Sequence, residues 1–528
     1  MPMRKSKPKK PVIEINAEFQ QALNSMEQTN RHIFITGRAG TGKSTLLDYF
    51  RTITRKKVAV LAPTGVSALN VKGQTIHSFF KFKPNTTLDK IKKLYKDDDD
   101  NNTIYRRLDT IIIDEVSMVR ADLLDCIDKF LGLNGPERNK PFGGIQMVFI
   151  GDLYQLPPVV TSEEKMLFAT VYDTPYFFSA RVFERLEMEF IELNKIYRQH
   201  DELFIKLLNA IRNNSVTDED MELLNQRYIP DYEPPPGDFY IHLTTTNNIA
   251  DTINNKQLEK LDGTLYTFTG IIEGNFGKEY LPTSVNLPLK IGSQVMLLNN
   301  DIFGRWVNGS VGKVSDIEIT EDKKQIETAI MVELPNGDVV DVLPYTWEIF
   351  RYSINGGQLQ SDAVGKFTQY PIMLAWAVTI HKSQGKTFDK VIIDIGKGTF
   401  AHGQLYVALS RCTTLEGLIL KKPLRKNHIW MDYKVVKFLT RYQYGKAEQA
   451  CSLTEKVALI QQTIERGGRL RIVYLKPSDE KTERIIQPKM VGEMEFHDVN
   501  YIGVEAFCFS RKQHRVFRVD RILKLETL

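Results

Sequence analysis

Residues 37–44, GRAGTGKS, have the types and spacing that hold nucleotide phosphates. They fit the pattern GxxxxGK[ST], in which glycines let backbone N–H groups approach phosphate oxygens. The amine of Lys43 can reach the β and γ phosphates, and the hydroxyl of Ser44 can ligate Mg²⁺. The pattern predicts a site for ATP and Mg²⁺ that uses Gly37, Ala39, Gly40, Thr41, Gly42, Lys43, Ser44 and Thr45.

Two acids follow the apolar run in LDTIIIDEVS, residues 108–117. Asp114 would hold the Mg²⁺, and Glu115 is placed to activate the attacking water. A strand end capped by an acid pair is the alternative.

A neutral amide, Gln155, stands three residues after Asp152 in GDLYQLPPV. An amide can sense the γ phosphate without adding a charge that must be desolvated. Taken alone the stretch could be a turn, because Pro157 and Pro158 are turn formers.

Elements that could position these residues are visible as apolar runs with helical segments between them. The runs are HIFIT (32–36), KVAVLAPT (57–64), LDTIIIDEVS (108–117) and IQMVFIGD (145–152). This alternation predicts an α/β fold, a parallel sheet covered by helices.

The bulk composition is that of a soluble protein. Hydrophobic residues make up 42% and charged residues 26% of the 528 residues, and the longest apolar run (372–380) is too short to span a bilayer. A net charge of +5 is small, so any basic surface must be local. The four cysteines have no CxxC spacing, which favours reduced cytosolic thiols over a zinc site.

Regions of different character interrupt the α/β pattern. The N-terminus, MPMRKSKPKKP, indicates a solvated basic tail over residues 1–15 rather than a nucleic-acid arm, and it lacks the apolar segment of a targeting signal. Residues 80–106 form a polar insertion with an acidic run at 97–100. Short alternating strands with Asn-Gly turns over 265–365 predict an inserted antiparallel barrel.

Eight motifs in order resemble those of superfamily one helicases, specifically the Pif-one family in the branch that also holds RecD-like enzymes. They span about residues 16–440. The motifs are GRAGTGKST, APTGVSALN, GQTIHSFF, IIIDEVSM, PFGGIQMVFIGDLYQLPPV, LNKIYRQ, AWAVTIHKSQGKTFD and GQLYVALSRC.

The resemblance implies two RecA-like P-loop lobes with ATP between them. It assigns residues 16–180 to the first lobe, with 80–106 as a wedge that meets the duplex. Residues 181–264 and 366–440 form the second lobe, and 265–365 form an inserted SH3-like barrel.

The resemblance also implies roles for residues around the nucleotide. Arg198 and Arg411 are expected to reach the γ phosphate and to stabilise its spreading charge. Gln20 lies about where the family reads adenine, and Gln21 competes for this role.

Two segments match the family's contacts to single-stranded DNA. They are Pro63, Thr64, Thr75 and His77 in the first lobe, and His381, Lys382, Ser383 and Gln384 in the second. Hydroxyls, backbone N–H groups and a lysine hold phosphates without reading bases. Thr64 and Ser383 are also good N-cap residues, so helix capping is the alternative.

The stretch VTIHKSQGKTF, residues 378–388, looks like the end of a second phosphate loop. A second loop needs a glycine five residues before Gly385, where the chain has Ile380, so that interpretation fails. The stretch instead predicts an element that couples DNA to ATP, with His381–Gln384 facing DNA and Gly385 approaching the ATP cleft.

Residues 453–528 resemble a WYL domain, a small α+β domain with an Sm-like barrel. The namesake Trp-Tyr-Leu is here Asn500, Tyr501 and Ile502. A basic face of Arg484, Arg515, Arg518 and Arg521 could bind nucleic acid or a nucleotide. A scaffold role is the alternative.

The resemblance implies an ATP-dependent DNA helicase that moves 5′ to 3′ on single-stranded DNA. Forks and other single-strand/duplex junctions, RNA–DNA hybrids and G-quadruplexes are the expected substrates, in replication, repair, recombination and telomere maintenance. The expected state is a monomer in a bacterial cytoplasm, with no membrane partner. A RecD-like recombination subunit and a nucleotide-gated nucleic-acid-binding regulator are the alternatives.

Overall fold

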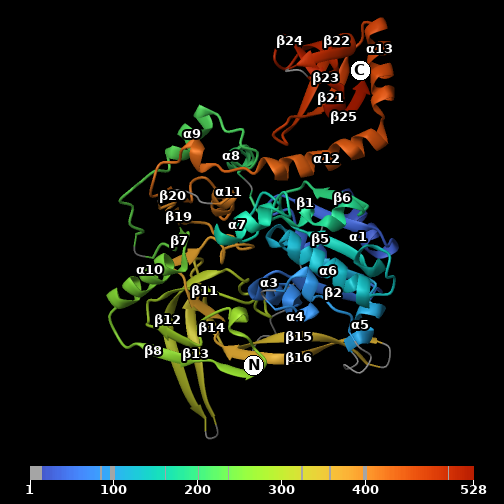
Figure 1. The fold of residues 1–528 in the computed structure, drawn as a ribbon. Helices are drawn as coiled ribbons and strands as arrows, with labels where there is room; N and C mark the ends of the chain where they lie inside the picture. Colours follow the sequence, from blue (N-terminus) through green and yellow to red (C-terminus); the bar gives the residue numbers. More distant parts are fainter. Residues whose placement is uncertain are drawn as a thin grey trace, which may run out of the picture. The chain divides into compact units, whose positions relative to one another are not determined.

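A computed structural model describes the chain from residue 15 to residue 528, except for 84–85, 95–100, 161, 200, 236, 323–324, 356–357, 397–400 and 497–498 (Figure 1). The expected basic tail, apart from Ile15, and the acidic run at 97–100 lie outside the described residues. The chain divides into two compact units. Unit 1 is Met1–Leu208 with Thr217–Trp430, and unit 2 is Asn209–Val216 with Met431–Leu528.

The first lobe of unit 1 is built on a parallel sheet with the strand order β3-β2-β4-β5-β1-β6. Its strands are β1 (His32–Gly37), β2 (Val58–Ala62), β3 (Gln74–Thr75), β4 (Thr110–Ile113), β5 (Gln146–Ile150) and β6 (Met188–Leu193). Strands covered on both faces are buried along their whole length, as β4 and β5 are. The Phe34 ring packs against Phe190 of β6, so the first lobe extends to Leu193, past the expected limit at 180.

The helices of this lobe are explained by local sequence features, namely N-cap residues and apolar residues at helical spacing. For example, α1 starts where the Asn16 side chain accepts a hydrogen bond from the Phe19 N–H, and α6 buries Leu124, Ile127 and Leu131 at helical spacing. The helices are α1 (Ala17–Gln28), α2 (Lys43–Ile53), α3 (Gly65–Asn70), α4 (Ile76–Phe80), α5 (Asn101–Arg107), α6 (Ala121–Asn134) and α7 (Ser162–Ala169).

The insertion at 80–106 is anchored by aromatic packing where it is described. The Tyr105 ring stacks on Phe80 and meets Phe130 edge-on, and the Tyr105 hydroxyl donates to the Phe79 carbonyl at 2.7 Å. These contacts fix α5 to the body of the first lobe.

The second lobe has a smaller parallel sheet with the order β18-β7-β19-β20. The side chain of Asn254 on α10 makes both backbone hydrogen bonds to Ala377 of β18, which fixes this helix to the sheet edge. The strands are β7 (Ile241–Thr244), β18 (Ala377–Thr379), β19 (Val391–Ile393) and β20 (Leu418–Leu420). The helices are α8 (Glu202–Arg212), α9 (Asp218–Asn225), α10 (Asn247–Lys260) and α11 (Gln404–Leu409).

An antiparallel β region is inserted into the second lobe. Its main sheet, β14-β13-β12-β11-β17, surrounds an apolar core that includes Val295, Trp306 and Ile372, so the region continues to Leu374, beyond the expected end at 365. Figure 1 shows β12 with β13, and β15 with β16, as long two-stranded arms. The strands are β8 (Tyr266–Thr269), β9 (Ile271–Gly274), β10 (Asn286–Leu289), β11 (Gln294–Leu297), β12 (Val311–Asp322), β13 (Gln325–Glu333), β14 (Val339–Val342), β15 (Tyr345–Asn355), β16 (Gln358–Gln369) and β17 (Ile372–Leu374).

The β15–β16 arm reaches back to the first lobe. The Val60 N–H of β2 donates to the Tyr352 hydroxyl at 3.1 Å, and the Phe79 ring meets the Tyr352 ring edge-on. The Gln74 side chain also donates to the Phe350 carbonyl. The sequence predicts strands in this region, but it indicates neither the arm nor its docking site.

Unit 2 packs two helices on an antiparallel sheet with the order β24-β23-β22-β21-β25. Its elements are α12 (Tyr433–Ala450), α13 (Leu453–Glu465), β21 (Leu470–Leu475), β22 (Lys481–Phe496), β23 (Val499–Cys508), β24 (Gln513–Arg518) and β25 (Ile522–Thr527). Unit 2 therefore begins before the expected limit at 453. It also includes Asn209–Val216, where the buried Arg212 side chain lies 4.0 Å from Asp479.

Candidate functional site

The glycine-rich stretch forms a turn between β1 and α2. Gly40 and Gly42 have φ of +81° and +85°, a region that favours glycine, and Gly42 is the N-cap of α2. Thr41 is buried, and its hydroxyl donates to the Arg38 carbonyl at 3.0 Å, whereas Ser44 and Thr45 are exposed in the first turn of α2. The turn thus presents a helix N-terminus with free hydroxyls, a geometry that suits phosphate.

Lys43 lies across this turn and faces several acids. Its Nζ donates to the carbonyls of Gly37 at 2.8 Å and Arg38 at 3.0 Å. Burial lowers the pKa of Lys43, and the charges of Asp152 and Glu115 oppose that shift. The strands β1, β4 and β5 end at one edge of the sheet, which is why these side chains converge.

Of the acid pair after β4, Asp114 is buried and Glu115 is half-buried. Burial is the main cause that raises the pKa of Asp114 to about 6 and that of Glu115 to about 7, and the Asp114 charge raises the latter further. Glu115 has a φ of +51°, an uncommon conformation for a residue with a Cβ. Asp114, Glu115 and Asp152 surround the single cation Lys43, so negative charge is in excess. This excess, next to the exposed Ser44 hydroxyl, suits a divalent cation.

Gln155 is buried beside Asp152. Its Nε2 lies 3.2 Å from the Asp152 carboxylate, and its backbone N–H donates to the Asp152 carbonyl at 2.9 Å. Asp152 is fully buried, and among the acids around Lys43 its charge raises the pKa of Lys43 most. It therefore belongs to the site, although the motif pattern did not single it out. Its position at the end of β5 was the available signal.

The segment after β6 covers the glycine-rich turn. The Tyr197 N–H donates to the Gly40 carbonyl at 2.8 Å, and a Cβ added at Gly40 would lie 2.4 Å from the Cβ of Arg198. Burial lowers the pKa of Arg198. Gly40 is therefore required both for its φ and for the close approach of Arg198.

A second-lobe tyrosine that motif reasoning did not assign also touches the turn. The Ala39 N–H donates to the Tyr406 hydroxyl of α11 at 3.1 Å. Nearby, a ring nitrogen of His402 lies 2.9 Å from the Leu153 carbonyl. The motif GQLYVALSRC contains Tyr406, but only the folded arrangement of the lobes identifies its partner.

The turn at residues 381–386 contacts the nucleotide residues directly. The Gln384 Nε2 donates to a Glu115 carboxylate oxygen at 3.0 Å, and Arg198 donates to the Gly385 carbonyl at 3.0 Å. Arg411 lies behind the turn and donates to the carbonyls of Ser383 and Lys386 at 3.3 and 3.2 Å. Burial, then the neighbouring charge of Arg198, lowers the pKa of Arg411 to about 9.

The residues of this turn differ in accessibility. His381 and Lys382 are exposed, but Ser383 is fully buried and donates from its hydroxyl to the Ile380 carbonyl at 2.8 Å. Ser383 therefore presents no side chain for DNA in this arrangement, because its hydroxyl stabilises the turn from inside. It caps no helix either, since it lies within a turn.

The first-lobe candidates for DNA contact lie at two helix starts. Thr64 caps α3 by accepting from the Ser67 N–H, and Thr75 caps α4 by accepting from the Ser78 N–H. Pro63 and His77 are half-buried, and burial lowers the pKa of His77. The Thr75 hydroxyl also lies 2.8 Å from the Tyr280 hydroxyl of the inserted region, so it is already engaged.

The two adenine candidates behave differently. Gln20 is exposed, and its amide donates to Asn24 at 2.8 Å within α1. Gln21 donates to Glu189 of β6 at 3.0 Å and so helps to hold α1 on the sheet. Gln20 thus keeps the more accessible side chain.

The four arginines expected to form a basic face lie on β22, on β24 and in the short 3-10 helix Val519–Arg521 after β24. Arg518 forms two hydrogen bonds to Asp520 and lies over the Tyr501 ring at 5.1 Å. Arg515 is exposed, whereas Arg484 and Arg521 are half-buried. The ion pair with Asp520 makes Arg518 less available to an anion than the exposed Arg515.

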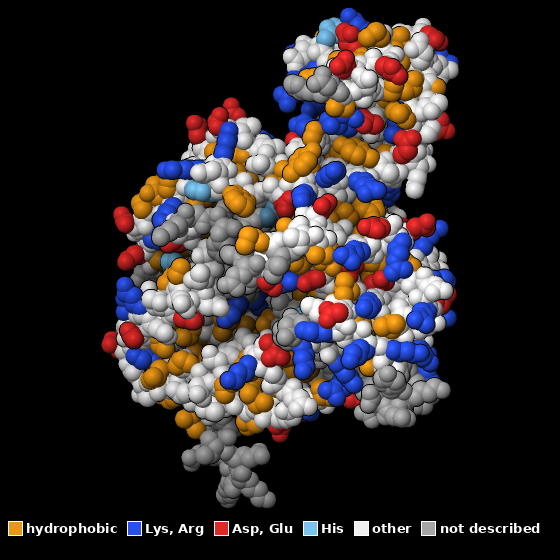
Figure 2. Space-filling view, in the orientation of Figure 1, with side chains coloured by type: hydrophobic (Ala, Val, Ile, Leu, Met, Phe, Trp, Pro, Cys, Tyr) orange, Lys and Arg blue, Asp and Glu red, His pale blue; other side chains and the backbone are white. Residues whose placement is uncertain are grey.

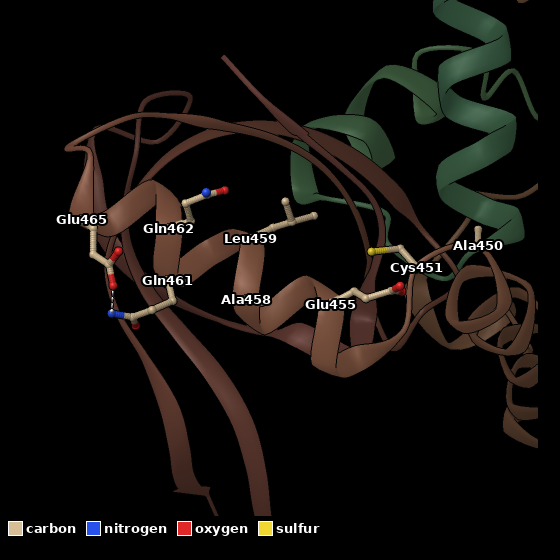
Figure 3. A pocket seen from close by; sticks show the side chains of 8 residues that line it. All are labelled: Ala450, Cys451, Glu455, Ala458, Leu459, Gln461, Gln462 and Glu465. Atoms are coloured by element: carbon tan, nitrogen blue, oxygen red, sulfur yellow. Dashed lines mark hydrogen bonds between the residues drawn. The ribbon is translucent and has the colours of Figure 1, made fainter.

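A shallow pocket of about 770 Å³ lies along α13 in unit 2. Figure 3 shows two acids, Glu455 and Glu465, among its lining side chains, with the Gln461 amide bonded to Glu465 at 3.3 Å. Its residues belong to unit 2, whereas the nucleotide residues belong to unit 1.

The geometry defines a P-loop nucleotide site that is completed by a second lobe. Family models agree with this class. Residues 14–222 match the PIF1-like helicase, 374–419 match the UvrD-like helicase C-terminal domain, and 455–527 match the WYL domain.

Relatives match over most of unit 1. The chain is 31% identical to the ATP-dependent DNA helicase Pif1 of Bdellovibrio bacteriovorus, over 82% of this chain and 93% of that one. It is 33% identical to human ATP-dependent DNA helicase PIF1, over 76% of this chain and 60% of that one. Bacteroides Pif1 in complex with ADP-AlF4 aligns with a TM-score of 0.74 at 37% identity, over 81% of this chain and 97% of that one.

The chain belongs to the PIF1-like helicase family. Its enzyme class is that of ATP-dependent DNA helicases, with two RecA-like lobes and a C-terminal WYL domain. The family resemblance and the fold class expected from the sequence are confirmed. Across the part of the chain that the structure describes, no helix has both the length and the hydropathy needed to cross a membrane.

Proposed function

We propose that this helicase moves 5′ to 3′ along single-stranded DNA and unwinds forks and other single-strand/duplex junctions. RNA–DNA hybrids and G-quadruplexes are proposed further substrates. The observation that carries the proposal is the turn at 381–386, which contacts Glu115 through Gln384 and Arg198 through Gly385. A turn in contact with the nucleotide residues and with exposed His381 and Lys382 supports coupling of hydrolysis to movement.

The proposed nucleotide chemistry uses the turn after β1 and the acids that face it. Lys43 binds the β and γ phosphates, Gln155 senses the γ phosphate, and Glu115 accepts a proton from the attacking water. Arg198 and Arg411 stabilise charge on the phosphoryl oxygens. Arg411 also fixes the turn at 381–386, which Arg198 contacts through the Gly385 carbonyl. Backbone groups from Gly37 to Thr45 cradle the phosphates, Gly385 borders them, and Gln20 contacts adenine.

Ser44 and Asp114 would hold Mg²⁺. When bound, the ion neutralises phosphate charge during transfer. The buried acids fit it, because a divalent cation favours the ionised carboxylates that burial disfavours. Mg²⁺ commonly uses one or two protein oxygens beside phosphates and waters, so a full protein cage is unnecessary.

The proposed DNA track follows the helix starts of the first lobe and the turn of the second. Pro63, Thr64, Thr75 and His77 contribute on one side, and His381 and Lys382 on the other, next to Gln384, whose side chain is bonded to Glu115. The insertion at 80–106 is proposed to meet the duplex. Figure 2 shows Lys and Arg side chains gathered over the region of α5 and β15, where Arg106, Arg107 and Arg351 are exposed.

The proposed setting is a bacterial cytoplasm, supported by the likeness to bacterial relatives, and the proposed state is a monomer. We propose that the WYL domain binds nucleic acid or a nucleotide through Arg484, Arg515 and Arg521, with Arg518 held by Asp520. Its sheet has an exposed Arg515, which supports an anionic ligand.

ATP hydrolysis with and without DNA tests the proposal. Single-stranded DNA should stimulate hydrolysis more than duplex DNA does, and Glu115→Gln should abolish hydrolysis while sparing ATP binding. Stronger stimulation by duplex DNA would count against movement on a single strand. Turnover retained by Glu115→Gln would remove Glu115 from its proposed role.

A further inference from the structure

The loop between β11 and β12 exposes three large apolar side chains within six residues. Ile302 is 86% exposed, Phe303 64% and Val307 63%. Ile302 is the most exposed large hydrophobic residue among those the structure describes. These three residues are called the apolar tip below. Clustered apolar exposure of this kind marks a binding surface more often than isolated exposure does.

The loop that carries the apolar tip is rigidly built. The Asp301 carboxylate accepts hydrogen bonds from the Phe303 and Arg305 N–H groups at 2.9 and 3.1 Å, and from the Arg305 guanidinium at 3.0 Å. Arg305 also pairs with Asp341 of β14 at 2.5 Å. A loop fixed in advance loses little conformational freedom when a ligand binds.

The apolar tip is combined with a cation and a buried aromatic anchor. The Arg305 guanidinium lies 5.6 Å from the Phe303 ring centroid and 4.7 Å from that of Trp306. Trp306 is buried in the core of the inserted region and donates to Asn299 at 3.1 Å. An exposed phenylalanine beside an arginine is the combination on which nucleobases stack.

The same loop touches the turn proposed to contact DNA. The Lys386 Nζ donates to the Asn308 side-chain oxygen at 2.5 Å, and a Cβ added at Gly309 would lie 3.4 Å from the Lys386 side chain. Lys386 follows Gly385, and its carbonyl accepts from Arg411. The loop with the apolar tip is therefore tied to the turn that joins DNA and nucleotide.

We infer that the apolar tip is a nucleobase-binding site, on which one or more bases of the single DNA strand stack against Phe303. The inference rests on the proposed function. It adds a contact to DNA bases, whereas the proposed track contacts only the DNA backbone. Every base has an apolar face, so the contact tolerates any sequence.

Equilibrium binding of a labelled oligothymidine tests the site. Phe303→Ala should weaken binding about five- to a hundredfold, as loss of one stacked base does. Phe303→Trp should restore binding, and the dependence on salt should keep its slope, because no phosphate contact is lost. Val339→Ala, at an exposed apolar residue of the same inserted region, is the matched control and should bind like the wild type.

An abasic strand of equal length makes the test specific. The wild type should bind it more weakly than oligothymidine, and Phe303→Ala should bind it as the wild type does. An equal loss on both strands, or no loss on either, would overturn the inference. So would a wild type that is dimeric and a Phe303→Ala variant that is monomeric, because the tip would then bind a second copy.

Failure of the proposed function gives a different result. In that case the wild type itself would bind oligothymidine poorly and its hydrolysis would not respond to it. Thermal unfolding of Phe303→Ala should match the wild type, since the side chain is largely exposed. A clear fall in melting temperature would instead assign Phe303 a structural role.

Discussion

At the residue scale, the acids at the end of β4 show how burial sets the chemistry. The half-buried Glu115 faces Lys43, Arg411 and Gln384, and the removal of its carboxylate from solvent raises its pKa to about 7. The neutral form is therefore favoured below that pH, and the carboxylate can accept a proton only above it.

ATP hydrolysis should consequently fall with pH below neutrality. A base with a pKa of about 7 predicts a loss of about tenfold per pH unit under that value. Steady-state rates from about pH 5.5 to about pH 8.5 at constant ionic strength provide the measurement. A rate that stays flat across this range would contradict the assignment of Glu115 as the base.

Some site residues could be predicted from sequence and others could not. The turn at 37–44 and the acids at 114–115 are local patterns, because one strand, one turn and one helix position them. Tyr406 contacts Ala39 across 367 residues, and no local pattern encodes that pairing. Ser383 fits a contact motif, but only the fold shows that its side chain is buried.

At the element scale, the turn at 381–386 contacts Glu115 and Arg198, and we propose that it couples DNA to ATP hydrolysis. The Gln384 side chain points inward to Glu115, whereas the side chains of His381 and Lys382 are exposed. Spacing excluded a second phosphate loop, but it did not reveal that Gln384 reaches Glu115.

His381→Ala should weaken DNA-stimulated ATP hydrolysis more than basal hydrolysis. The exposed ring lies on the proposed DNA side of the turn, whereas the contacts to Glu115 and Arg198 come from Gln384 and Gly385. Hydrolysis rates at saturating ATP, over a titration of single-stranded DNA, separate the two effects. An equal loss of both rates would argue that His381 supports the nucleotide site instead.

The β15–β16 arm makes a prediction about stability. Tyr352→Phe removes the acceptor of the buried Val60 N–H while keeping the ring contact with Phe79, and it should cost about 1–3 kcal/mol. Thermal unfolding monitored by circular dichroism should show a lower melting temperature. Tyr345→Phe, on an exposed part of the same arm, is the control. Equal melting of Tyr352→Phe and wild type would mean that the arm does not dock as described.

At the scale of the whole molecule, the domain boundaries differ from those expected from the sequence, because strand pairing and packing join segments that are distant in the chain. The sequence assigns residues 188–193 to the second lobe, but in the structure they form β6, which pairs with β1 of the first lobe. Residues 209–216 belong to unit 2 although they are far from it in sequence. Such assignments depend on long-range packing, which periodicity does not report.

The buried Arg212 and Asp479 pair predicts how unit 2 is held together. Asp479→Asn would remove a buried negative charge that lies 4.0 Å from the Arg212 side chain, with both side chains 3% exposed, and should destabilise unit 2 by about 3–5 kcal/mol. Asparagine tolerates the φ of +60° at this position, so the backbone is not strained further. Proteolysis of the C-terminal unit should accelerate. Asp520→Asn, in a half-exposed pair with Arg518, should change it little.

Unit 1 aligns less well with the DNA-bound form of a relative than with its unliganded form or its complex with ADP-AlF4. Unliganded Bacteroides Pif1 aligns with a TM-score of 0.74, and the form bound to single-stranded DNA aligns with 0.58, at 36% and 37% identity. The contact between Thr75 and Tyr280 belongs to this arrangement, and it occupies a hydroxyl that the proposed DNA track uses.

Unwinding of two duplexes that differ only in the polarity of their single-stranded tail tests the central claim most directly. With ATP and Mg²⁺, the 5′-tailed duplex should be separated and the 3′-tailed one should not, and Glu115→Gln should separate neither. Preferential unwinding of the 3′-tailed duplex, or ATP hydrolysis without separation of either duplex, would contradict a 5′-to-3′ helicase.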